Sequence, residues 1–253
     1  MTGTGSAMDD FLEILRSERR DVIERLRKTR FSTLKTGYSH QQVIPYASYS
    51  PWLDDSKFMA LFETVRDHTL VDIYRSYELY SLAKQVQLLQ GDLIEIGVWR
   101  GGTAALIASA LPGRTIHLFD TFAGVPKADK NFDTLYSGGE HADTDEICVK
   151  HLFDTLSLPC RINPGVFPED TLQHLPERVS LAHIDVDTYI SAKDSFAAIW
   201  PRILPTGMVI FDDYGFFGCE GVTQLVNEIS SSADNALFVH NINGHALLIK
   251  KHA

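Results

Sequence analysis

Four aspartates in two short segments are the residues of this chain best suited to do chemistry. Asp185 and Asp187 lie in the segment HIDVDTY, and Asp212 and Asp213 lie in the segment FDDY. Each segment ends a short apolar run typical of a strand, so in an open parallel sheet all four carboxylates should face one crevice. Because four negative charges repel one another, we expect a hard divalent cation there, Mg²⁺ being the simplest candidate. We predict Asp185, Asp212 and Asp213 as ligands and Asp187 as a fourth ligand or the general base. The alternative is that the Asp pairs cap the helices that follow.

A glycine-bearing turn and a second acidic position predict a nucleoside site. The turn, Glu95 to Thr103, joins a predicted strand to a helix, and its glycines permit a sharp bend and close approach to a ligand. Asp120 ends the next predicted strand, where a carboxylate can accept hydrogen bonds from both hydroxyls of a ribose. The glycine spacing departs from G-x-G-x-x-G, which argues against a pyrophosphate cradle. Glu95 suits a cationic ligand, and S-adenosylmethionine carries a sulfonium and an ammonium. Alternatively, Glu95 and Asp120 cap helices or pair with Arg100 or Arg114. The predicted cofactor-binding residues are Glu95, Gly97, Trp99, Arg100, Gly101, Thr103, Asp120 and Asp185.

Side by side, the two sites predict methyl transfer to a hydroxyl oxygen. A hydroxyl bound to a metal becomes more acidic and is held for in-line attack on the methyl carbon, with no covalent enzyme intermediate. The predicted catalytic residues are Asp185, Asp187 and His141. His141 is the second candidate for the base, because a neutral imidazole accepts a proton at pH 7. It lies within Phe122 to Asp143, a long stretch without periodicity that we predict to be an active-site lid.

The elements around these residues predict an α/β fold with a Rossmann-like, mostly parallel sheet covered by helices on both faces. Predicted strands cover 93–97, 115–120, 161–163, 179–185, 208–212, 236–240 and 245–250, and predicted helices cover 57–67, 71–89, 103–110, 144–156, 191–200 and 222–230. An amphipathic helix is expected at 10–30 as an N-terminal extension. We therefore predict a helical arm at 1–55 and one catalytic domain at 56–253.

Composition excludes several classes of partner. The net charge of −10 disfavours binding to nucleic acid and to anionic membranes. The three cysteines have no zinc-ligand spacing, and we expect free thiols. There is no run of eighteen apolar residues and no apolar N-terminal stretch typical of a secretory signal, so we expect a cytoplasmic protein.

At its motifs the sequence resembles the macrocin O-methyltransferase (TylF-like) group of class I methyltransferases. The matching segments are TLVD at 69–72, the stretch 77–83, IEIGVWRGG at 94–102, FDTFAGVP at 119–126, HIDVDTY at 183–189 and GMVIFDDY at 207–214. The resemblance implies a Rossmann-like sheet, S-adenosylmethionine as the donor, Mg²⁺ held by the aspartates, and a sugar or phenolic hydroxyl of a natural product as the acceptor. It also implies a homodimer or larger assembly.

Two rival functions stay open at the level of sequence. A non-catalytic nucleoside- or metal-binding module would keep Glu95 and Asp120 but would not need four carboxylates beside an open crevice. A nicotinamide-dependent oxidoreductase would need a glycine pattern suited to pyrophosphate and a proton donor near the cofactor. Neither feature is convincingly present.

Overall fold

The computed structural model describes residues 4–28, 34–35, 38–39, 49–232 and 234–252, and it divides into two compact units that meet at Ser50 and Pro51. The first unit contains helix α1 (Thr4–Lys28) and a short antiparallel pair, β1 (Leu34–Lys35) and β2 (Tyr38–Ser39). The predicted N-terminal helix is therefore present. Large apolar side chains of α1, among them Phe11 and Ile14, are exposed. The division into an arm and a catalytic domain at residue 55 stays a prediction.

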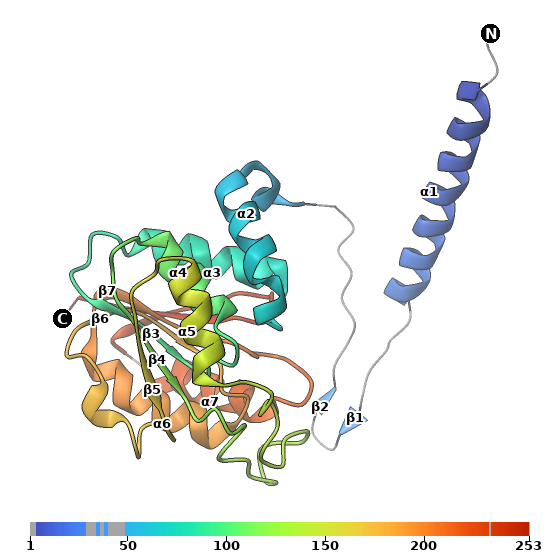
Figure 1. Cartoon of the computed structure of the whole chain (residues 1–253). Coiled ribbons are helices and arrows are strands. Elements are labelled where there is room, and N and C mark those ends of the chain that lie inside the picture. Colours follow the sequence, from blue (N-terminus) through green and yellow to red (C-terminus); the bar gives the residue numbers. More distant parts are fainter. Residues whose placement is uncertain (1–3, 29–33, 36–37, 40–48, 233, 253) are drawn as a thin grey trace. The chain divides into compact units, whose positions relative to one another are not determined.

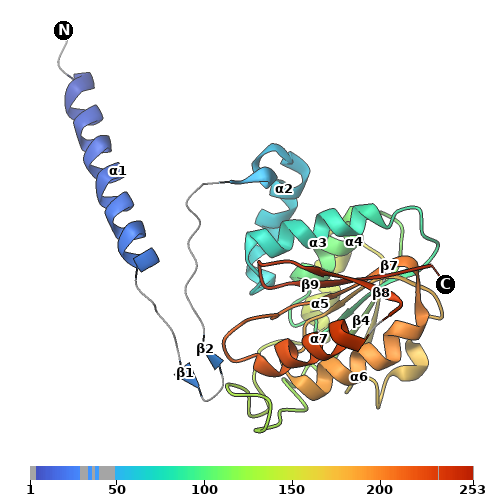
Figure 2. The same ribbon diagram turned by 180° about the vertical axis from the view of Figure 1, so that it is seen from behind.

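The second unit is built on a seven-stranded sheet in the order β5-β4-β3-β6-β7-β9-β8 (Figures 1 and 2). Its strands are β3 (Asp92–Ile96), β4 (Ile116–Asp120), β5 (Cys160–Pro164), β6 (Val179–Ile184), β7 (Ile203–Phe211), β8 (Ala236–His240) and β9 (Ala246–Lys250). The first five are parallel in the sheet, whereas β9 runs antiparallel to both β7 and β8. This is the mostly parallel sheet that the alternation of strands and helices predicts.

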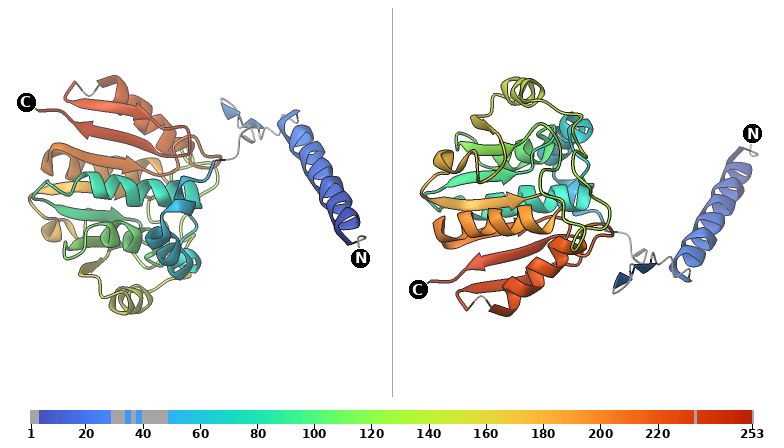
Figure 3. Two further views of the ribbon diagram at one scale, coloured as in Figure 1. Left: turned by 90° about the horizontal axis from the view of Figure 1, so that it is seen from above. Right: turned by 90° about the horizontal axis from the view of Figure 1, so that it is seen from below.

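Helices cover both faces of this sheet (Figure 3). One face packs against α3 (Ile73–Gln85), α4 (Gly102–Ala110) and α5 (Glu146–Thr155), with α2 (Ser56–Val65) packed on α3 and α4. The other face packs against α6 (Tyr189–Ile199) and α7 (Glu220–Ser232). Short 3₁₀ turns lie at Pro51–Asp54, Arg66–His68, Leu172–His174 and Trp200–Arg202. The two buried clusters include Phe58 and Leu106 on the first face and Phe119 and Phe211 on the second.

Local sequence signals explain where the helices begin. The side chain of Asp72 accepts hydrogen bonds from the backbone N–H groups of Tyr74 and Arg75, which caps α3. Asp145 caps α5 in the same way through the N–H of Cys148. Helix α4 instead follows Gly101, whose φ of 83° is a left-handed conformation that glycine adopts without strain. The glycine turn thus connects β3 to α4, and α4 begins without a side-chain cap.

The order of the strands creates a crevice between β3 and β6. The chain builds β3, β4 and β5 in one direction and then returns to place β6 on the opposite side of β3. At such a switch point the loops after neighbouring strands separate, and ligands bind in the crevice that they leave. The loop from 121 to 145, which includes the aperiodic stretch Phe122 to Asp143, contains no helix or strand, and its role as a lid stays a prediction. Across the described ranges, no helix combines the length and the apolar character needed to cross a membrane.

Candidate active site

A cavity lies at the carboxyl ends of the parallel strands. It collects residues from the loops after β3, β4, β5, β6 and β7, of which the loop after β4 is the segment 121–145, together with the segment before α3. Most of the predicted site residues line it: Gly97, Trp99, Thr103, Asp120, His141, Asp185, Asp187, Asp212 and Asp213. The structure therefore brings together two sets of residues whose nearest members, Asp120 and Asp185, are 65 positions apart in the sequence.

The loops of this cavity hold strained and tightly packed backbone. Trp99, His141, Asp187 and Asp213 have φ values of 48°, 60°, 62° and 63°, a left-handed region that is unfavourable for most residues. Gly97 has a φ of 80°, and a Cβ built on it would lie 1.6 Å from the backbone oxygen of Asp185. Only glycine fits there, so the loops after β3 and β6 are in direct backbone contact.

The first half of the cavity is organised by Asp120. Its Oδ2 accepts hydrogen bonds from the backbone N–H groups of Val98 at 2.6 Å and Trp99 at 2.9 Å, and its Oδ1 accepts one from Phe122 at 2.7 Å. The carboxylate therefore fixes the glycine turn and the start of the loop after β4. Each carboxylate oxygen has more than one acceptor site, so Asp120 keeps capacity for a ligand hydroxyl.

A surface contact joins the glycine turn to the far end of the loop 121–145. Asp143 accepts hydrogen bonds from Trp99 Nε1 at 2.9 Å and from Arg100 Nη2 at 2.8 Å. The Arg100 guanidinium also lies 4.4 Å from the centre of the Trp99 ring. Arg100 thus holds the loop from outside the cavity, which it does not line.

Glu95 and Gly101, two other predicted cofactor residues, also lie away from the cavity lining. Glu95 is fully buried and pairs with His183, with 2.7 Å between its Oε1 and His183 Nδ1. The two residues are register partners on β3 and β6, so their side chains leave the sheet on the same face. Burial raises the pKa of the Glu95 carboxyl, although His183 acts in the opposite direction. Glu95 thus pairs with His183 on the neighbouring strand, and not with Arg100 or Arg114.

The second half of the cavity is the acidic cluster. Asp185, Asp212 and Asp213 each offer an oxygen, and these atoms lie within 4.8 Å of one another. Burial, and then the charge of Asp212, raises the pKa values of Asp185 and Asp213 well above the usual range. The carboxyls thus repel one another, as the sequence predicts. Three convergent carboxyl oxygens are a donor set that fits a hard divalent cation.

Asp212 differs from its neighbours because it has a cationic partner. Its Oδ1 is ion-paired with Arg75 of α3 and accepts a hydrogen bond from the N–H of Asp213 at 2.8 Å. Burial alone would raise the pKa of Asp212, but His245 and Arg75 lower it below the usual value. Its Oδ2 is buried without a hydrogen-bond partner. An orphaned carboxylate oxygen beside Asp185 and Asp213 again fits a ligand atom for a cation.

Asp187 has its own set of neighbours. Burial raises the pKa of its carboxyl, whereas a hydrogen bond from Tyr136 and the nearby His141 lower it. The Tyr136 hydroxyl also lies 3.5 Å from His141 Nε2. The two predicted candidates for the base, Asp187 and His141, are therefore linked through one phenol on the loop 121–145. Burial and Asp187 raise the pKa of Tyr136, so the phenol keeps its proton.

Sequence reasoning missed Arg75 and Tyr136 as residues of this cavity. A signal for Arg75 was available: Arg75, Leu79, Ala83 and Val86 follow helical spacing and all are buried, so Arg75 lies on the apolar face of α3. A buried arginine requires a carboxylate partner. No comparable signal identifies Tyr136, because its loop has no periodic pattern.

Comparison with known protein families gives one clear match. The family model described as macrocin-O-methyltransferase (TylF) matches residues 60–246. Among curated proteins, 8-demethyl-8-(2,3-dimethoxy-alpha-L-rhamnosyl)-tetracenomycin-C 4'-O-methyltransferase of Streptomyces olivaceus is 31% identical over 192 residues, which cover 65% of this chain and 73% of the relative. Mycinamicin III 3''-O-methyltransferase of Micromonospora griseorubida is 30% identical over 171 residues, covering 60% and 67%. Demethyldecarbamoylnovobiocin O-methyltransferase of Streptomyces niveus is 29% identical over 186 residues, covering 67% and 70%.

Solved structures agree at the level of fold. The O-methyltransferase NovP superposes with a TM-score of 0.63 at 24% identity, covering 73% of this chain and 83% of NovP. The calicheamicin methyltransferase CalS11 superposes with a TM-score of 0.61 at 18% identity, covering 84% of this chain and 98% of CalS11.

Proposed function

Because this chain belongs to the macrocin O-methyltransferase (TylF) family, it is an S-adenosylmethionine-dependent O-methyltransferase, and we propose that it methylates a sugar hydroxyl of a glycosylated natural product with the help of Mg²⁺. Membership of the family sets aside the two rival functions, a binding module and an oxidoreductase. The observation that carries the cation proposal is the convergence of Asp185, Asp212 and Asp213 in the same cavity as Asp120.

We assign the donor to the loops after β3 and β4. Asp120 would accept hydrogen bonds from the ribose hydroxyls, and the backbone from Gly97 to Trp99, fixed by Asp120, would follow the nucleoside. Thr103 lines the same cavity. When bound, S-adenosylmethionine supplies an activated methyl group. The chain's own task is to hold the donor so that the methyl carbon points toward the aspartates.

We assign the acceptor hydroxyl to the aspartate half. Asp185, Asp212 and Asp213 would hold the cation, which when bound lowers the pKa of a hydroxyl that it contacts. Asp187 would accept the hydroxyl proton at a carboxylate oxygen. The Tyr136 phenol keeps its own proton and donates to Asp187, which orients that carboxylate. His141, on the other side of the phenol, is the second candidate for the proton acceptor.

A glycoside suits the mixed character of the cavity. Leu70, Val71 and Val125 supply apolar surface, whereas Thr69 and His141 supply polar atoms. A sugar attached to an apolar aglycone offers the same combination. One curated relative is named for 4'-O-methylation of a rhamnosyl tetracenomycin, and another for 3''-O-methylation of mycinamicin III.

The test is a transfer assay with the purified chain after removal of metals by a chelator. The acceptors are paired: a macrolide or aromatic glycoside, and the aglycone of each without its sugar. We expect a mass gain of one methyl on the glycoside only, with stoichiometric S-adenosylhomocysteine, loss of activity in chelator and recovery with Mg²⁺. Full activity in chelator would refute the cation, and methylation of the free aglycone would refute the sugar as the acceptor.

A further inference from the structure

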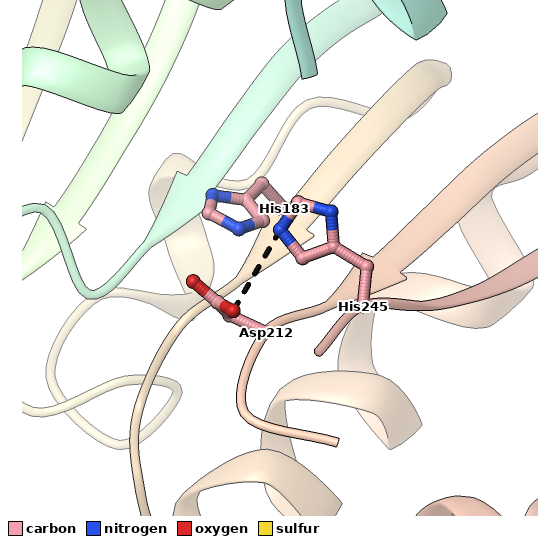
Figure 4. A group of neighbouring side chains, drawn as sticks. All are labelled: His183, Asp212 and His245. Carbon is pink, nitrogen blue, oxygen red and sulfur yellow. Dashed lines mark ion pairs between the residues drawn. The ribbon is translucent and has the colours of Figure 1, made fainter. Parts of the chain in front are cut away.

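A second group of potential metal ligands lies between the sheet and α3. His183 on β6, Asp212 after β7 and His245 before β9 point toward one another (Figure 4). Their relative exposures are 0%, 2% and 0%. Each residue offers one ligand atom, and these atoms lie within 4.8 Å of one another; the pair His245 Nε2 and Asp212 Oδ1 is separated by 3.6 Å. The proposed mechanism of methyl transfer uses neither histidine.

The other nitrogen of each imidazole is already engaged by a carboxylate. His183 Nδ1 lies 2.7 Å from Glu95 Oε1, and His245 Nδ1 lies 2.6 Å from Glu78 Oε2. A neutral ring that donates its proton from Nδ1 carries its lone pair on Nε2. The same carboxylate–histidine arrangement orients imidazole ligands around protein-bound metals, where it fixes the tautomer and raises the basicity of the ligand atom.

The convergent atoms have no hydrogen-bond partner. His183 Nε2, His245 Nε2 and Asp212 Oδ2 are all buried and unsatisfied. When both rings are neutral and donate from Nδ1 to their carboxylates, all three atoms are acceptors and do not hydrogen-bond to one another. Buried polar atoms without partners cost free energy, and the two imidazole Nε2 atoms beside the Asp212 carboxylate call for a shared partner that accepts electron pairs.

The charge around this group points to the same partner. Glu78, Glu95 and Asp212 supply three carboxyls, and Arg75 is the guanidinium that pairs with Asp212. Arg75 also pairs with Asp72, so the guanidinium is shared between two carboxyls. A divalent cation would bind beside these carboxyls and imidazoles, and paired or metal-bound charges are the form in which charges are tolerated in a protein interior.

We propose that His183, Asp212 and His245 form a second divalent-cation site, selective for a metal of the Zn²⁺ type. Two imidazoles and one carboxylate suit Zn²⁺ or a neighbouring transition metal, whereas Mg²⁺ prefers oxygen ligands only. A tetrahedral site with metal–ligand bonds of about 2.0–2.1 Å places its ligand atoms about 3.3 Å apart. The ligand atoms of this group lie within 4.8 Å of one another, so each pair would have to move closer by no more than about 1.5 Å. Asp212 belongs to both groups of ligands, so this ion would also position that carboxylate toward Asp185 and Asp213.

The first experiment needs no variant. The full chain is treated with chelator, loaded with one equivalent of Zn²⁺, and examined by X-ray absorption at the zinc edge. We expect outer-shell scattering from two imidazoles together with a short oxygen shell. A shell of oxygen alone would overturn the proposal, because it would place the ion among the aspartates. This measurement does not depend on the sugar acceptor or on Mg²⁺, so it can fail while the proposed function holds.

Variants then locate the ion. His245→Gln and His183→Gln should each weaken Zn²⁺ binding by about 10- to 100-fold or more, measured by competition with a chromophoric chelator. His174→Gln replaces an exposed histidine and is the matched control for adventitious surface binding. Asp185→Asn removes a proposed Mg²⁺ ligand and should leave Zn²⁺ affinity nearly unchanged. Unaltered affinity in both histidine variants would refute the site and would leave the rings as partners of their carboxyls only. If neither variant folds, as judged by circular dichroism, the absorption spectrum of the wild-type chain decides.

Discussion

The two halves of the cavity differ in the groups that hydrogen-bond to their carboxylates. Asp120 in the donor half accepts three backbone hydrogen bonds from Val98, Trp99 and Phe122, so the chain itself completes this half. In the aspartate half, burial and mutual repulsion raise the pKa values of Asp185 and Asp213, and Asp212 Oδ2 has no partner. The first half is organised before a ligand arrives, whereas in the second half Arg75 pairs with Asp212 and leaves Asp185 and Asp213 to repel each other.

Because of this difference, we expect mutations in the two halves to change different properties of the enzyme. A change in the organised half should alter the affinity for the donor, because the backbone that contacts the nucleoside depends on Asp120. A change in the aspartate half should alter turnover, because those carboxylates act on the acceptor and its cation. The predictions below test this separation.

The largest effect is expected for Asp213→Asn. Asparagine tolerates the left-handed backbone at this position, where φ is 63°, so the change removes charge with little strain. We expect kcat to fall on the order of 10³-fold, in the range seen when one electrostatic contact to the reacting group is lost. The affinity for S-adenosylhomocysteine, measured by titration calorimetry, should stay within about threefold. Weak product binding together with normal turnover would reverse the assignment of the halves.

Gly97→Ala should damage both halves at once. A Cβ at this position would lie 1.6 Å from the Asp185 oxygen, and the φ of 80° is unfavourable for alanine. Overpacking and the left-handed conformation together should cost about 2–4 kcal/mol of stability. Thermal unfolding measures this loss, and Gly113→Ala is the matched control, because Gly113 also has a positive φ of 84° but no atom within 4 Å of its Cβ. Equal losses in the two variants would show that the contact between the loops contributes nothing.

The sequence reveals much of this arrangement because its signals are local. The strand runs, the acids at the ends of strands and the glycine turn each occupy a few consecutive residues, and parallel strands bring such ends to one edge. The predicted strands and helices are accordingly all present, with boundaries shifted by a few residues; the strand expected at 208–212, for example, spans Ile203–Phe211.

Local sequence patterns do not predict which residues pair with the buried charges. Arg75 meets Asp212 at a separation of 137 positions, and Glu78 meets His245 at a separation of 167. The partner of Glu95 depends on the register of β3 against β6, which a single strand does not specify. We therefore expected Glu95 to face the cofactor, whereas its nearest partner is His183. The assigned roles of the individual site residues stay predictions.

Asp120→Asn tests the organised half with a smaller expected effect. The amide keeps the shape of the side chain but loses the charge that strengthens its hydrogen bonds to Val98 and Trp99 and to a ribose hydroxyl. We expect the dissociation constant of S-adenosylhomocysteine to rise about 10- to 100-fold, equivalent to about 1.4–2.7 kcal/mol. At saturating donor, kcat should change little. Asp154→Asn, on the exposed face of α5, is the control. An unchanged dissociation constant would remove Asp120 from the donor site.

The smallest effect is a pH dependence of the stabilisation by Mg²⁺. The pKa values of Asp185, Asp187 and Asp213 are raised in the folded chain, so the native state binds more protons than the unfolded state. Without a cation, the contribution of these three carboxyls to stability should therefore be largest at low pH and should fall as the pH rises from about 4 through their folded pKa values. The lowered pKa of Asp212 has the opposite sign, but its contribution is complete above the unfolded value of about 4 and is constant at higher pH.

A cation must displace the protons that these carboxyls retain, so it binds more weakly at low pH. A tenfold gain in affinity adds about 1.4 kcal/mol of stabilisation when the cation is in excess, or about 2–6 °C in Tm. We therefore expect the rise in Tm on addition of Mg²⁺ to be a few degrees larger at pH 8 than at pH 5.5. Asp213→Asn should shrink both the rise and its pH dependence, whereas Asp120→Asn should leave both intact. A rise that is equal at the two pH values would mean that the acidic cluster is already ionised without a cation, and the contrast between the halves would then fail.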